Sequence, residues 1–140
     1  MTCSEQERRP LMQYLNIAAI GLGGCLGALS RFYLNELVVR RFPETPYWGT
    51  FTVNVLGCLV IGFLMALVAT HQHSFPTWLY LLLITGFLGS LTTFSTFGYQ
   101  AVELLRASRF GECLLYVAAN LACGLLAVVL GWLLSAPWTR

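Results

Sequence analysis

The chain has 140 residues, of which 57% are hydrophobic and 10% are charged, and its formal net charge is +2. Soluble domains carry about 25% charged residues, so this composition excludes an ordinary soluble protein. Crossing a bilayer as a helix takes about 20 mainly apolar residues, and the sequence offers four such segments. We therefore expect an all-α integral membrane protein with a single membrane domain over residues 1–140.

The predicted elements follow one another with short connections. Residues 1–10 form a polar N-terminal lead, to which we assign no function. An even number of spans places both ends of the chain on the same side of the membrane. The four predicted transmembrane helices cover residues 11–39, 48–69, 74–105 and 113–136.

The basic residues divide almost equally between the two expected sides of the membrane, and the chain contains no Lys. An excess of Lys and Arg on the cytoplasmic side normally sets the orientation, so a near tie permits insertion in both directions. Such a chain can form an antiparallel homodimer, which resembles the inverted repeats of some transporters. A single dominant orientation remains the alternative. The two sets are Arg8, Arg9 and Arg140 on one side, and Arg40, Arg41, Arg106 and Arg109 on the other.

Small and polar residues recur at helical spacing in the first, second and fourth predicted helices. Polar side chains are costly in lipid, so they indicate the face that each helix turns toward protein or water. Small residues on the same face permit close helix approach. The three stripes are Gly23, Gly27, Arg31 and Asn35; Thr50, Asn54 and Gly57; and Tyr116, Asn120 and Gly124.

The third apolar segment is uncharged over 29 residues, from 74 to 102, which is longer than one straight span needs. Gly86 and Gly89 precede a run of Ser and Thr residues, and all of these are poor helix formers. These features predict a broken helix, and a glycine kink made for packing is the alternative. Unwound backbone inside a membrane is tolerated only within protein or beside a wet cavity, and its carbonyls often bind ions.

Two phenylalanines follow the predicted break. Phe94 and Phe97 share a helix face, next to a polar line formed by Thr92, Thr96 and Gln100. The positive edge of a phenyl ring can face an anion without offering a cation that would trap it. Aromatic pairs at this spacing are also common in helix cores, so the spacing alone leaves both interpretations open.

The sequence lacks the groups that catalysis or proton coupling requires. No carboxylate lies deep in a predicted span, since Glu36 and Glu103 are near helix ends. No nucleophile and base pair or metal-ligand cluster is evident, and the glycine run at 21–27 opens a membrane helix instead of following a strand. We therefore expect that the protein is not an enzyme.

Three motifs in order resemble the Fluc (CrcB) family of small fluoride channels. They are GGCLGALSRF at 23–32, GTFTVN at 49–54 and TGFLGSLTTFSTF at 85–97. The resemblance implies an antiparallel, dual-topology homodimer in the bacterial inner membrane. It also implies two pores, each lined by both subunits, through which cytoplasmic fluoride leaves passively.

The resemblance further assigns roles to individual residues. A structural sodium ion would lie at the dimer centre, held by the backbone carbonyls of Gly89 and Thr92 from both subunits. Many relatives carry Glu where this chain has Gln100, so the polar line here lacks that negative charge. Arg31 would supply a favourable field for anions. The implied fluoride-pore residues are Phe94, Phe97, Asn54, Thr50, Ser95, Thr96, Arg31 and Gln100.

Two other functions remain as alternatives. A proton-coupled small multidrug-type exporter of cationic compounds can also be a dual-topology dimer of four-helix chains. Such an exporter needs a membrane-embedded carboxylate, which the predicted spans do not offer. A packing or assembly subunit without transport is the third possibility, and the hydroxyl-rich break argues against it.

Overall fold

The computed structural model describes residues 3–71 and 74–138, with side chains from residue 11 onward in these ranges. Within this part of the chain, four helical segments are long and apolar enough to cross a membrane, which confirms the predicted membrane fold. No strand occurs in the described ranges. The four segments are Leu11–Arg41, Tyr47–Thr70, Thr77–Arg106 and Phe110–Trp138.

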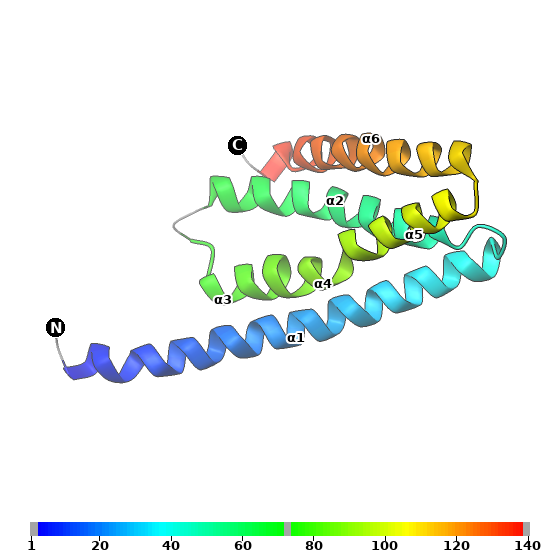
Figure 1. Cartoon of the computed structure of the whole chain (residues 1–140). Helices are drawn as coiled ribbons and strands as arrows, with labels where there is room; N and C mark the ends of the chain where they lie inside the picture. The colour runs from blue at the N-terminus through cyan, green and yellow to red at the C-terminus, as the bar shows by residue number, and fades with distance from the viewer. Residues whose placement is uncertain (1–2, 72–73, 139–140) are drawn as a thin grey trace.

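The helices form an elongated bundle in which the third span crosses between two outer layers (Figure 1). α2 (Tyr47–Thr70) and α6 (Phe110–Leu134) run side by side in one layer, and the long α1 (Cys3–Arg41) forms the other. The third span begins beside α1 and ends beside α6. Its crossing places the middle of this span at the centre of the bundle.

Two helix starts differ from the predicted ones. α1 begins at Cys3, inside the predicted polar lead of residues 1–10, because Glu, Gln and Arg are good helix formers outside an apolar run as well. The third span begins at Thr77, where residue 74 was expected, because the preceding Pro76 is extended with ψ 135°. The predicted spans 48–69 and 113–136 correspond to α2 and α6, with bounds shifted by one to three residues.

The third span is broken, as predicted, and consists of several short elements. A π-helix, η1 (Leu81–Leu88), follows the short α3 (Thr77–Tyr80) and leads into α4 (Gly89–Leu91). The backbone is then extended at Thr92 and Thr93, with ψ values of 156° and 116°. α5 (Phe94–Arg106) resumes the helix immediately afterwards.

The glycines that suggested the break lie before it and are helical. Gly89 has φ −61° and ψ −29°, so its backbone is ordinary right-handed helix. Gly86 is buried, and a Cβ atom there would lie 2.7 Å from the Ile20 carbonyl oxygen. The break therefore begins after these glycines, within the predicted run of Ser and Thr residues, and Gly86 serves the packing of η1 on α1.

Glycines bring two helix pairs into backbone contact. On α1, a Cβ atom at Gly23 or Gly27 would lie 2.1 Å from a carbonyl oxygen of Leu82 or Phe87, respectively. Between α2 and α6, a Cβ atom at Gly62 would lie 2.1 Å from the Val128 carbonyl oxygen. Helices associate in membranes through such small residues, so the predicted close-approach face of α1 is confirmed.

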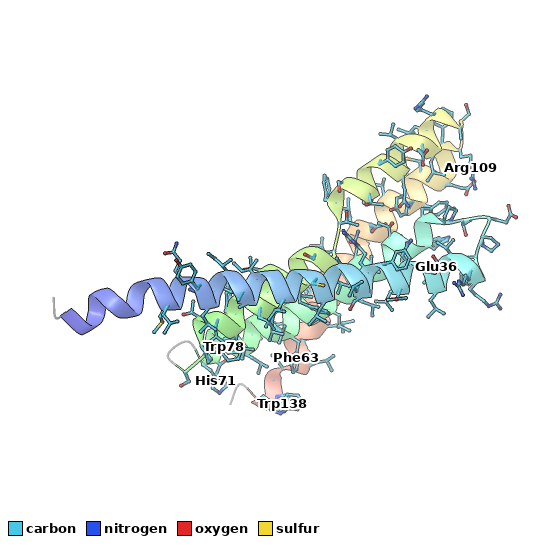
Figure 2. All side chains as sticks on the ribbon, turned by 90° about the horizontal axis from the view of Figure 1, so that it is seen from below. Glu36, Phe63, His71, Trp78, Arg109 and Trp138 are labelled. Atoms are coloured by element: carbon cyan, nitrogen blue, oxygen red, sulfur yellow. The ribbon has the colours of Figure 1, made fainter. Side chains whose placement is uncertain are left out.

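Most large apolar side chains point outward, as expected for a bundle surrounded by lipid, while the buried core is small. Its main cluster combines Tyr47, Leu104, Cys113 and Tyr116. Glu36 and Arg109 lie toward one end of the bundle, and His71, Trp78 and Trp138 lie toward the other (Figure 2). Tryptophan at a helix end fits a membrane–water interface. The short η2 (Ala136–Trp138) follows α6 there.

Candidate ion pathway

The extended backbone at the break is held by the side chain of Asn54 on α2. The Asn54 Oδ1 atom accepts a hydrogen bond from the Thr93 N–H at 2.9 Å. The Asn54 Nδ2 atom donates to the Thr93 carbonyl oxygen at 3.3 Å. The Asn54 amide thus replaces the two hydrogen-bond partners that the Thr93 N–H and carbonyl oxygen would have in a helix. Lipid offers no hydrogen bonds to such backbone groups.

Hydroxyl groups surround the start of α5. The Thr93 Oγ1 atom accepts a hydrogen bond from the Thr96 N–H at 3.2 Å, which caps the helix. The same hydroxyl donates to Thr96 Oγ1 at 3.1 Å and lies 3.1 Å from Ser95 Oγ. On the other side of the break, the Thr92 hydroxyl donates to the Leu88 carbonyl oxygen at 3.1 Å. These bonds fix both helix ends.

A hollow of about 390 Å³ opens between α2, α6 and the broken span, and we call it the phenylalanine groove. The Phe94 and Phe97 ring centroids are 5.6 Å apart. Phe97 also packs on Tyr116 at 5.3 Å, whereas 81% of the Phe94 surface is exposed. The lining of the groove includes Asn54, Gly57, Gly89, Thr92, Thr93, Phe94, Phe97 and Asn120.

A second hollow of about 340 Å³ lies between α1, α2 and α5, and we call it the polar chamber. Its lining contains no carboxylate among the described residues, and Arg31 forms no ion pair within them. The charge in this chamber is therefore positive and favours anions. The polar chamber is lined by Ala28, Arg31, Phe32, Asn35, Thr50, Val53, Thr93, Thr96 and Gln100.

Gln100 is oriented by a tyrosine from α6. Tyr116 is fully buried, and its hydroxyl donates a hydrogen bond to Gln100 Oε1 at 2.9 Å. Because the amide oxygen faces Tyr116, the amide nitrogen of Gln100 is the group left for the polar chamber. One turn further along α6, Asn120 Nδ2 donates to the Tyr116 carbonyl oxygen at 2.9 Å. The Asn120 Oδ1 atom is buried and has no hydrogen-bond partner in the described part of the chain.

The residues implied by the family motifs divide between the two hollows. Gly89, Thr92, Asn54, Phe94 and Phe97 line the groove, and Arg31, Thr50, Thr96 and Gln100 line the chamber. The remaining one, Ser95, is exposed and lines neither hollow, although its hydroxyl is next to that of Thr93.

Two residues of this region carried no predicted site role. Thr93 lines both hollows, and its signal was its place as a Thr immediately before the helix that follows the break. Tyr116 was visible only as a member of the polar stripe on the fourth helix. Its partner Gln100 is 16 residues away, on another helix.

Comparison with known proteins places the chain in a family. Residues 18–132 match the family described as "CrcB-like protein, Camphor Resistance (CrcB)". Proteins named "Fluoride-specific ion channel FluC" are similar over most of their length. One from Acidobacterium capsulatum is 40% identical over 120 residues, which are 86% of this chain and 93% of that protein.

Two further relatives with the same name agree with this result. The Campylobacter fetus protein is 40% identical over 129 residues, covering 91% of this chain and 99% of the relative. The Bordetella pertussis protein is 42% identical over 118 residues, which are 84% of this chain and 88% of that relative. With its four candidate spans, the chain is a multi-pass membrane protein that belongs to the CrcB-like family.

Proposed function

We propose that the protein is a fluoride-selective channel of the bacterial inner membrane, through which cytoplasmic fluoride leaves by passive electrodiffusion. The observation that carries this proposal is the 40% identity, over nearly the whole chain, to relatives named fluoride-specific ion channels. Their names give no support to a proton-coupled small multidrug-type exporter. Passive conduction involves no bond making or breaking, so no enzymatic activity is proposed.

The two hollows provide the groups that a small anion needs. Fluoride is strongly hydrated, so a selective pore has to replace its water with hydrogen-bond donors. The polar chamber offers the Arg31 guanidinium, the Gln100 amide nitrogen and the hydroxyls of Thr50 and Thr96. In the phenylalanine groove, the positive ring edges of the phenyl pair attract an anion weakly and do not trap it.

An antiparallel homodimer, assembled from chains inserted in both orientations, completes the proposed pathway. The phenylalanine groove is open along one side of a single chain, and Phe94 at its rim is 81% exposed. A pore for an anion needs a protein wall there in place of lipid. Beside Gly89, a Cβ atom would meet only the Ile84 carbonyl oxygen at 3.8 Å, which leaves room for an inverted copy. Two copies would form two pores.

A structural sodium ion is part of the proposal, held at the dimer centre by Gly89 and Thr92 carbonyls. In a continuous helix these carbonyls would accept from the N–H groups of residues four positions later. Here the Thr93 N–H donates to Asn54 Oδ1, and the Thr96 N–H donates to Thr93 Oγ1. The Gly89 and Thr92 carbonyl oxygens therefore lose these helical donors and suit a hard cation. Such a cation would supply positive charge between the two breaks.

Fluoride efflux from liposomes tests the proposed function. Purified protein is reconstituted into vesicles loaded with potassium fluoride, and a potassium ionophore balances the charge while a fluoride electrode records release. We expect rapid fluoride release, and no chloride release from matched vesicles loaded with potassium chloride. Equal release of both anions, or release of neither, would contradict the proposal.

A further inference from the structure

Thr93 is the one described residue that lines both the polar chamber and the phenylalanine groove. It lies in the extended break, directly before Phe94, and is 9% exposed. The charged residue Arg31 lines the chamber, and the phenyl pair, Phe94 and Phe97, lines the groove. An ion that moves from one hollow to the other therefore passes next to Thr93.

The position of Thr93 is fixed on both its backbone and its side chain. On α2, Asn54 Oδ1 accepts a hydrogen bond from the Thr93 N–H at 2.9 Å, and Asn54 Nδ2 donates one to the Thr93 carbonyl oxygen at 3.3 Å. The Thr93 Oγ1 atom lies 3.1 Å from Ser95 Oγ and 3.1 Å from Thr96 Oγ1. A polar group fixed in this way is already in place when an ion arrives, so little reorganisation is needed.

We propose that the Thr93 hydroxyl is the hydrogen-bond donor that passes an anion between the two hollows. This inference rests on the proposed fluoride channel. Without an ion, the hydroxyl hydrogen points to Thr96 Oγ1 while the oxygen accepts from the Thr96 N–H. A hydroxyl has one hydrogen and two lone pairs and rotates about its C–O bond. Its hydrogen can therefore turn to the anion while the cap of α5 stays intact.

The helix cap offers a structural alternative, and the choice of variants separates the two roles. Thr93→Val loses both the cap and the donor, so it cannot distinguish them. Asp is at least as good an N-cap as Thr, but its carboxylate only accepts hydrogen bonds and repels anions. Ser keeps the cap and the donor. Thr93→Asp thus keeps the cap and loses the donor, whereas Thr93→Ser keeps both, and the melting temperature of each variant reports its fold.

The experiment compares fluoride efflux from liposomes containing the full-length wild type, Thr93→Ser, Thr93→Asp and Thr93→Val, with melting temperatures recorded in detergent. We expect Thr93→Ser to conduct within about threefold of the wild type, and Thr93→Asp and Thr93→Val to be slower by about tenfold or more. The melting temperature of Thr93→Asp reports whether its cap offsets the burial of the new charge. Thr52→Val is the matched control, because the Thr52 hydroxyl donates to the Trp48 carbonyl oxygen and lines neither hollow.

The outcomes distinguish this inference from the proposed function. A Thr93→Asp protein that melts normally and conducts at the wild-type rate would overturn the role of Thr93 and leave the channel intact. A Thr93→Ser protein as slow as Thr93→Val would overturn it as well. If the wild type releases no fluoride, the proposed function itself fails.

Discussion

The Tyr116 hydroxyl donates to Gln100 Oε1 at 2.9 Å, and this bond decides which end of the Gln100 amide faces the polar chamber. Gln100 lines this chamber together with Arg31, and the amide nitrogen is the group that the Tyr116 bond leaves free for it. A carboxylate at position 100 could accept the same bond from Tyr116 and would bring a negative charge into the chamber. The neutral amide therefore gives this chain a more anion-attracting chamber than a glutamate would.

Replacing Gln100 by Glu is expected to weaken fluoride entry without destroying the fold. The new charge offsets the field of Arg31, and a repulsion of roughly 1 kcal/mol corresponds to about a fivefold higher half-saturating fluoride concentration. The measurement is fluoride flux as a function of fluoride concentration in liposomes. Gln13→Glu, an exposed position on α1, is the control and should leave the curve unchanged. An unshifted curve for Gln100→Glu would remove Gln100 from the entry pathway.

Replacing Asn54 by Asp is expected to suppress fluoride flux through the break. Aspartate can accept from the Thr93 N–H but cannot donate to the Thr93 carbonyl oxygen, so that carbonyl loses its partner beside a new charge. Losing such a buried bond costs about 1–3 kcal/mol, so the melting temperature should also fall. Flux and thermal melting are measured together, with Asn16→Asp on α1 as the control. An Asn54→Asp protein of normal flux would show that the clamp on Thr93 is dispensable.

Replacing Phe94 by Ile tests the phenyl pair separately from packing. Phe94 is 81% exposed in the single chain, so a smaller side chain there removes little core packing. We expect the proposed dimer to stay folded while fluoride flux falls by about tenfold, because the positive ring edge is lost. Size-exclusion chromatography and liposome flux are the two measurements. Phe110→Ile, which is 65% exposed at the start of α6, should conduct normally. Normal flux through Phe94→Ile would exclude its ring from the pathway.

Replacing Gly62 by Ala is expected to destabilise the contact between α2 and α6. The added methyl carbon would lie 2.1 Å from the Val128 carbonyl oxygen, so the two backbones have to separate. Overpacking of this kind costs typically about 1–3 kcal/mol. Thermal melting in detergent measures the effect. Gly21→Ala is the control, because a Cβ atom there meets nothing within 4 Å and alanine favours a helix. Equal melting temperatures for Gly62→Ala and the wild type would contradict this packing.

The architecture was predictable where one physical constraint dominates. Bilayer thickness sets the length of an apolar helix, so composition located all four spans. Because polar groups are costly in lipid, the stripes of small and polar residues indicated which helix faces are turned toward protein. The structure places four of these residues on packed faces: Gly23, Gly27, Thr50 and Asn54.

Helix propensity predicted the break but did not fix which residues unwind. Gly86 and Gly89 are helical, and the chain unwinds at Thr92 and Thr93, within the run of Ser and Thr residues that follows them. Propensity is a weak prior that tertiary contacts override. The contact that decides here is the Asn54 amide, which reaches Thr93 from 39 residues away and has no signature in the local sequence. The pore roles, the sodium ion and the inverted partner remain predictions.

The most direct test is the reversal potential of single channels in a planar bilayer, with fluoride on one side and, on the other, an about tenfold lower fluoride concentration made up with chloride. The proposal predicts currents that reverse close to the fluoride equilibrium potential, with equal conductance for channels inserted in either direction. Currents that reverse near zero, as for a pore open to both anions, would contradict it.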